Sequence, residues 1–335
     1  MLIRLIAMDA LALLASVLVP LGILLSAARW SHRSVLRRQV FTPVDAESCS
    51  AVVARQLRRG RIAGGIVAGS VLLQIGLTWL PVNATEWYLW SFLVPLVVAV
   101  LALAALHLRP LETPVTPAGV ARPLDLNPRT LWSFGRRWWF AGWLAATTLL
   151  VVTMLLAGVI SGPDENGHHT LLTISVGSAS ASSQFLGWFY GVPLLFCVAA
   201  LTAVTSLALR TVARPPLVAT ADARTLDLLL RRMSTRMILS VSTGAVLVTL
   251  GLVWKLIALA ARMRGGVLTE TAGSVEVGTS FAALATPLWA GGYLAEGLGI
   301  ALLLFAVLAR APLVVRADSA PAAPAPGGAA SGVRA

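Results

Sequence analysis

Apolar runs of about 20 residues, separated by short polar segments, dominate this chain. Seven such runs lie near residues 6–27, 62–80, 89–108, 138–160, 187–208, 237–260 and 282–309. A helix of about 20 apolar residues is long enough to cross a hydrocarbon layer ~30 Å thick. Lipid offers no hydrogen-bond partners to the backbone, so such runs form helices, in which the backbone N–H and C=O groups bond to one another. The pattern predicts an all-α membrane protein with seven transmembrane helices over residues 1–317, followed by a disordered Ala/Pro/Gly-rich tail at 318–335.

A motif recurs at the start of three of these runs. Trp90-x4-Pro95 returns as Trp188-x4-Pro193, and a weaker copy surrounds Pro287. Each run then closes on an Arg–Pro–Leu-like element, so the repeated unit is a membrane hairpin, and the copies share one orientation. In transporters, helices broken at matching positions of repeats often mark a central site. The three prolines are therefore a candidate signal for transport.

The placement of arginines predicts how the helices cross the membrane. Of the 26 basic residues, 22 lie in four alternate segments, at 28–61, 109–137, 210–236 and after residue 309. Cytoplasmic loops carry an excess of Lys and Arg, so we expect the N-terminus outside and the C-terminus inside. The same charge faces anionic lipids of the inner leaflet, which we expect as partners. No nucleic-acid module accompanies the charge, so we expect no nucleic acid as a partner.

Composition also bears on the source. Lys255 is the one lysine among those 26 basic residues, in a chain rich in alanine, glycine and valine. This bias is typical of a high-GC genome. We expect the plasma membrane of a bacterium.

The cytoplasmic segments combine residues that start helices with arginine pairs. The pairs are Arg58-Arg59, Arg136-Arg137 and Arg231-Arg232. Leu226, Leu229 and Leu230 share one helical face beside the third pair. Amphipathic helices of this kind lie along the membrane interface. We therefore expect short helices, separate from the spanning ones, that give a protein partner a docking surface at the cytoplasmic loops.

Two longer outer loops, 161–184 and 261–280, each contain a β-prone stretch. The stretches are Leu171–Val176 and Ser274–Val277, and they are candidates to pair into a small cap.

The first loop also contains four side chains of metal-ligating type, Asp164, Glu165, His168 and His169. Adjacent histidines point to different sides, and no second ligand group is visible. We favour a solvated loop over a metal site.

Three ionisable residues fall inside the apolar runs: Asp9, Lys255 and Glu296. Such residues are functional candidates by default because charge is expensive in lipid. Counted at ~1.5 Å per residue from the arginines at the inner boundary, Glu296 lies about 21 Å deep. By the same count, Lys255 and Asp9 lie about 28–30 Å from that boundary, near the outer interface.

Other residues are expected at the membrane interfaces. We expect His107 at the inner interface, and Trp138, Trp139 and Trp188 in the aromatic belt.

Helical spacing predicts what these charges face. Small residues share the face of each one: Gly292 and Gly299 with Glu296, Gly251, Gly244 and Ser240 with Lys255, and Ala12 and Ser16 with Asp9. Small residues mark helix contacts in lipid, so the charges point into the bundle. The sixth and seventh helices are consecutive, so an ion pair between Lys255 and Glu296 is expected. Two interpretations stay open: a structural lock, or a proton, cation or substrate site at Glu296.

Catalytic motifs are missing from the sequence. It has no Walker A loop, H-E-x-x-H, C-x-x-C, G-x-S-x-G or G-x-G-x-x-G element. We expect no enzyme activity, cofactor or metal. The leading hypothesis is a membrane interaction or regulatory subunit. The alternative is a transporter or ABC-type permease component with Glu296 in an intramembrane site.

Overall fold

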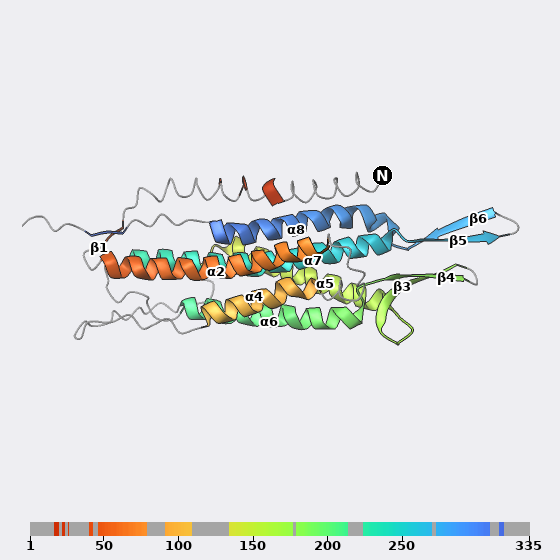
Figure 1. Cartoon of the computed structure of the whole chain (residues 1–335), viewed down its shortest axis with the longest axis horizontal. Helices are drawn as coiled ribbons and strands as arrows, with labels where there is room; N and C mark the ends of the chain where they lie inside the picture. Colours follow the sequence, from red (N-terminus) through yellow and green to blue (C-terminus); the bar gives the residue numbers. More distant parts are fainter. Residues whose placement is uncertain are drawn as a thin grey trace, which may run out of the picture.

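The fold is a bundle of long helices. A computed structural model of the chain describes residues 17–19, 22–23, 26, 40–42, 46–78, 91–108, 134–176, 179–213, 224–269, 273–308 and 315–317. The long helices are α2 (Ala46–Thr78), α4 (Val94–His107), α5 (Arg137–Ile160), α6 (Trp188–Ala213), α7 (Arg224–Ala261) and α8 (Ala285–Leu308). Single 3-10 turns, η1 (Ser91–Leu93) and η3 (Ala282–Leu284), lead into α4 and α8. The helices lie side by side along one axis (Figure 1).

Among the described residues, four helical segments are long and apolar enough to cross a membrane: 137–160, 188–213, 231–261 and 282–308. A shorter apolar helical segment covers residues 91–107. A mostly helical protein with spanning-length helices is therefore confirmed. The predicted run at 6–27, which holds Asp9, lies largely outside the described residues, as does the tail at 318–335. The count of seven helices and their orientation stay predictions.

The outward faces of the surrounding helices are apolar. Large exposed side chains include Leu144, Leu155 and Val159 on α5, Phe196 on α6 and Leu294 on α8. A surface helix of a water-soluble bundle carries polar residues on that face. Helices that are apolar both inside and outside suit a lipid environment.

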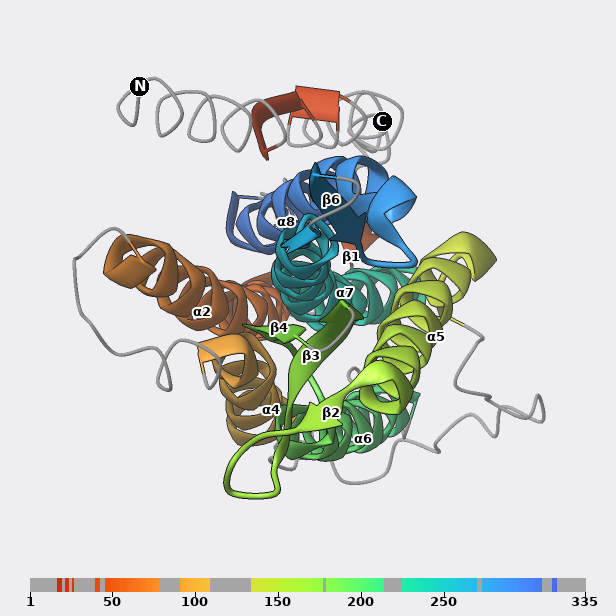
Figure 2. The same cartoon turned by 90° about the vertical axis from the view of Figure 1, so that its right-hand side faces the viewer.

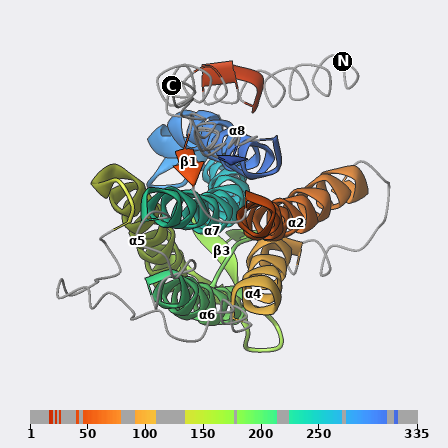
Figure 3. The ribbon, with the colours of Figure 1, turned by 90° about the vertical axis from the view of Figure 1, so that its left-hand side faces the viewer.

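Helix α7 is the centre of the bundle. It packs against α8, α5, α2, α6 and α4. Views down the bundle from its two ends both place α7 in the middle (Figures 2 and 3). Between Ser234 and Ala258 the partly exposed residues are Arg236, Leu247, Trp254 and Lys255, and the rest are buried. The central position explains why this helix, with α8, carries most of the buried polar residues.

Helix α7 also corrects one prediction. It runs unbroken through Arg231-Arg232 for 38 residues, about 57 Å, where the sequence predicted a separate interfacial helix. Arg231 is fully buried, whereas Arg232 is exposed. The Nη1 of Arg231 donates a hydrogen bond to the carbonyl of Val212, and its guanidinium lies 5.1 Å from the Phe134 ring centroid. These partners stabilise the buried cation, and extending a formed helix is cheaper than starting a second.

The first arginine pair follows the same pattern. Helix α2 runs unbroken from Ala46 to Thr78, through Arg58 and Arg59. The segment predicted as a separate cytoplasmic helix is therefore the first half of one long helix. The prediction of separate amphipathic helices is wrong at α2 as well as at α7.

Two hairpins extend from one end of the bundle (Figure 1). The first sheet contains β2 (Gly162–Pro163), β3 (His169–Val176) and β4 (Ala179–Gln184), and the second contains β5 (Arg264–Thr269) and β6 (Gly273–Gly278), all antiparallel. Both predicted β-prone stretches are thus strands. They do not pair with each other among the described strands, because each pairs within its own hairpin. Strand β5 instead lies against β3 and β4.

A further strand pair was not predicted. Strand β1 (Val40–Thr42) pairs in parallel with β7 (Val315–Ala317), which joins segments far apart in the sequence. In Figure 1 β1 lies at the end opposite the hairpins. Strands of three residues are too short for a readable alternation of polar and apolar positions.

Candidate functional site at the contact between α7 and α8

Glycines bring α7 and α8 into backbone contact. Gly244 and Gly251 of α7 face Gly299 and Gly292 of α8. A Cβ atom on Gly251 would lie 2.5 Å from the carbonyl oxygen of Gly292, and one on Gly299 would lie 2.7 Å from that of Gly244. Only glycine fits such contacts, which are typical of helix association in lipid. The predicted small-residue faces of both helices are confirmed.

The predicted ion pair lies beside these glycines. Lys255 Nζ is 2.5 Å from Glu296 Oε2. The Glu296 side chain is 2% exposed and that of Lys255 is 24% exposed. Removing a carboxylate from water is costly unless a partner compensates it, and the lysine supplies that compensation. Asp9, the third candidate, lies outside the described residues.

Aromatic rings continue this site toward the hairpin end. Lys255 Nζ lies 4.8 Å from the centroid of the Tyr293 ring, which meets the Trp289 ring edge-on at 4.8 Å. Arg262 stands over Trp289 at 5.6 Å. A cation over an aromatic face gains about 0.5–2 kcal/mol. Lys255 is thus held by a ring as well as by Glu296, which favours one fixed geometry for the pair.

A hydrogen-bonded cluster ties α7 to α5 and α6. The Trp143 Nε1–H and the Thr205 hydroxyl both donate to Ser242 Oγ, each at 3.0 Å, and all three residues are buried. This cluster is not among the features predicted from the sequence. The sequence feature that could have predicted it is the number of serines and threonines within the run 237–260, because such residues in lipid indicate contacts between helices.

The repeated prolines lie near the starts of their helices. Pro95 is in the first turn of α4, Pro193 is the sixth residue of α6, and Pro287 is the third residue of α8. A proline in the first turn leaves no intrahelical bond unmade, because that N–H has no partner anyway, and this applies to Pro95 and Pro287. Pro193 lies inside α6, so its missing N–H removes one intrahelical bond, yet the helix continues to Ala213. The link between the three prolines and transport stays a prediction.

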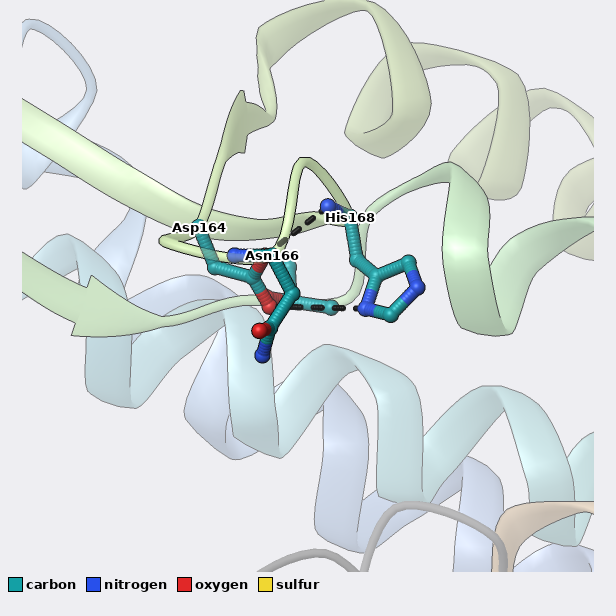
Figure 4. A network of polar contacts seen from close by, with 4 residues as sticks. Asp164, Asn166 and His168 are labelled. Carbon is teal, nitrogen blue, oxygen red and sulfur yellow. Dashed lines mark hydrogen bonds and ion pairs between the residues drawn. The ribbon is translucent and has the colours of Figure 1, made fainter.

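The outer-loop cluster is a turn held together by one carboxylate. Asp164 Oδ1 accepts hydrogen bonds from the backbone N–H groups of Asn166 and His168 at 2.8 Å, and Oδ2 accepts one from the Thr170 hydroxyl at 3.1 Å (Figure 4). Desolvation raises the pKa of Asp164, but these hydrogen bonds and the nearby His168 ring outweigh it, so the pKa lies below its usual value.

Two of the four candidate metal ligands in this loop contact other groups of the protein. His169 Nδ1 lies 3.0 Å from the carbonyl oxygen of Ser161, and Asp164 is occupied by the turn. No group of three His, Cys, Asp or Glu side chains that could hold a metal ion occurs among the described residues. These contacts support the solvated-loop interpretation.

Two residues expected at the interface are buried. The His107 side chain is 7% exposed, and its carbonyl accepts a hydrogen bond from the Thr211 hydroxyl at 3.1 Å. Trp139 is also buried, 5.3 Å below the guanidinium of Arg236, whereas Trp138 is exposed. Both residues lie close to a helix end, since His107 is the last residue of α4 and Trp139 is the third residue of α5, so their placement at the level of the interface stays a prediction.

Comparisons of the chain with family models, with curated proteins and with solved structures found no match.

Proposed function

We propose that this chain is a seven-helix integral membrane protein, with its N-terminus outside and its C-terminus inside, that acts as an interaction or regulatory subunit. The observation that carries the proposal is the closed contact between α7 and α8. Glu296, the deepest charge of the described helices, is neutralised by Lys255 and enclosed by backbone-to-backbone glycine packing. A cargo site has to open to its ligand, whereas this geometry is typical of a rigid scaffold.

Exposed arginines support a binding role. Arg58, Arg137, Arg210 and Arg232 are all exposed. Arg137 starts α5 and Arg210 lies in the last turn of α6, at the helix ends remote from the hairpins. A surface with one sign of charge steers and selects a partner of the opposite sign. The proposed partner is a protein with an acidic surface, bound where the arginine-rich ends of α5, α6 and α7 meet.

Site-specific photo-crosslinking in the native membrane tests this proposal. A photoreactive residue at Arg137 or at Arg210 should give the same defined product, whereas one at the outward-facing Leu149 should not. Reversal of charge at the other position, such as Arg210→Glu with the probe at Arg137, should remove the product. A product obtained equally from Leu149, or one unaffected by charge reversal, would contradict the proposal.

The proposed orientation is testable by labelling intact cells with a membrane-impermeant maleimide. In a chain lacking its two native cysteines, Ser182→Cys on β4 should be labelled, because that hairpin is proposed to lie outside. Ser319→Cys in the tail should be labelled only after the cells are broken. The reverse pattern would overturn the orientation.

Transport is the second candidate function, and one observation favours it. About a quarter of the Lys255 side chain is exposed, so water or a cation can approach the pair from that side. Purified protein in liposomes should then show a pH-dependent ion flux that Glu296→Gln abolishes. Equal flux in wild-type and Glu296→Gln liposomes would exclude this function for the pair.

A further inference from the structure

Arg262 is an exposed cation directly after α7, at the hairpin end of the bundle. Its backbone N–H donates a hydrogen bond to the carbonyl of Leu259 at 3.2 Å, which continues the helical turn beyond Ala261. The carbonyl of Ala261 accepts a hydrogen bond from the buried Thr279 hydroxyl at 2.8 Å. The backbone that carries Arg262 is therefore held in place on the outside of the bundle.

A row of cations and aromatic rings leads from Arg262 to the ion pair. The Arg262 guanidinium lies 5.6 Å from the centroid of the Trp289 ring, and that ring meets Tyr293 at 4.8 Å. Tyr293 in turn lies 4.8 Å from Lys255 Nζ, which binds Glu296. Arg262 is exposed, and Trp289, Tyr293 and Lys255 are partly exposed. The row can thus be reached from outside the bundle.

The charge at the Arg262 end of this row is uncompensated among the described side chains. Glu296 neutralises Lys255, whereas Arg262 forms no ion pair with a described carboxylate. A cation–π contact uses the face of a guanidinium and leaves N–H groups at its edge available as donors. Such an edge binds a phosphate through two parallel hydrogen bonds. Arg262 is therefore suited to a phosphate group.

Depth along α7 places Arg262 at the level of lipid headgroups. Arg236 and Arg262 are 26 residues apart, which is about 39 Å along a helix. A bilayer is ~30 Å thick across its hydrocarbon layer and ~40–45 Å thick with both headgroup layers included. The helix thus fits the bilayer with one arginine in each headgroup layer. Trp289 then lies in the aromatic belt, where such rings are enriched.

Apolar surface continues from Arg262 toward the hydrocarbon layer. Leu259 is 67% exposed and lies one turn below Arg262, about 4.5 Å deeper. Lys255, Leu259 and Arg262 follow one another at i, i+4 and i+7, so they share one side of the helix. A soluble phosphate would contact Arg262 alone, whereas a lipid also covers Leu259. The combination favours a lipid.

We propose that the surface formed by Leu259, Arg262 and Trp289 binds one glycerophospholipid from the leaflet at the hairpin end. The lipid phosphate accepts hydrogen bonds from the Arg262 guanidinium, which Trp289 positions. The glycerol region lies against the Trp289 ring, and one acyl chain lies along Leu259. This surface is at the opposite end of the bundle from the arginines proposed to bind a protein, so it is a separate site.

Capture of a lipid by the full-length protein tests the proposal. Photoreactive p-benzoylphenylalanine replaces Leu259, and the protein is delipidated in detergent and mixed with one molar equivalent of phosphatidylglycerol. Mass spectrometry of the intact protein measures the adduct after illumination. The matched control is the same replacement of Val159, which is 75% exposed in the last turn of α5, at the same end of the bundle. We expect at least about fivefold more adduct at position 259, because the arginine holds the headgroup there.

Substitutions distinguish this site from general contact with lipid. Arg262→Gln should lower the adduct at position 259 to the level at position 159, whereas Arg210→Gln, at the opposite end, should leave it unchanged. Trp289→Leu removes the ring that positions the guanidinium and should lower the adduct about threefold. This variant keeps the test valid if Arg262→Gln does not fold, which thermal melting without lipid reveals.

Two results would overturn the proposal. The first is equal adduct at positions 259 and 159, or an adduct at position 259 that a folded Arg262→Gln protein retains in full. The second comes from thermal melting with phosphatidylglycerol or with glycerol phosphate, for which we expect stabilisation by the lipid alone. Equal stabilisation by glycerol phosphate would assign the surface to a soluble phosphate.

Discussion

Replacing Gly251 by alanine should force α7 and α8 apart. The added methyl carbon would lie 2.5 Å from the carbonyl oxygen of Gly292 and 2.6 Å from the backbone nitrogen of Glu296. Atoms of a helix backbone cannot move aside individually, so the helices must separate by roughly 1 Å to restore ordinary contact at ~3.5 Å. Overpacking of this kind costs about 1–3 kcal/mol, and the helix propensity of alanine returns up to about 1 kcal/mol. We expect a net loss of about 1–2 kcal/mol.

Gly142 on α5 is the matched control. An added Cβ there meets no atom within 4 Å, so Gly142→Ala should be neutral or stabilise the protein by up to about 1 kcal/mol. Gly251→Ala should therefore lower the free energy of unfolding, whereas Gly142→Ala should leave it unchanged or raise it. Unfolding of the purified proteins by heat or by denaturing detergent, followed through tryptophan fluorescence, measures both. The chain carries 11 tryptophans, which give a strong signal.

The refuting result is specific. A Gly251→Ala protein as stable as wild type would show that the two backbones are not in contact at this position. A loss of equal size in Gly142→Ala would show that the effect belongs to glycine in any of these helices and not to the contact between α7 and α8.

Three other substitutions have expected outcomes. Glu296→Ala leaves Lys255 without its carboxylate and should cost about 1–3 kcal/mol, less than for a fully buried pair because water reaches the lysine; an unchanged melting temperature would count against a structural role. Ser242→Ala removes the acceptor for Trp143 and should cost about 1 kcal/mol by the same assay. Asp164 has a lowered pKa, so its carboxylate stabilises the turn above about pH 4, and this contribution is lost as the pH falls through the folded-state pKa. Hydrogen exchange of the turn amides, corrected for intrinsic rates, should rise in acid for wild type and not for Asp164→Ala.

Local patterns in the sequence were sufficient for several elements of the fold. Apolar run length predicted α5 and α8 to within three residues at each end. Alternating β-prone residues predicted β3 and β6 inside their loops. The face shared by Gly251 and Lys255, and that shared by Gly292 and Glu296, predicted the contact between α7 and α8 and its ion pair. Each of these depends on spacing within one segment, which a single sequence contains.

The sequence by itself therefore determined several of the elements, among them α5, α8, β3 and β6, the membrane-like composition and the closest helix pair. Only the tertiary structure decided that α7 is central and that Arg231 and His107 are buried. Only the structure shows that Arg236 Nε, Ser240 Oγ and Thr243 Oγ1 are buried without a hydrogen-bond partner among the described residues. In water, a polar face tells which side of a helix is outside. In lipid both sides are apolar, so that signal is lost, and the packing of the helices against one another decides which faces are buried.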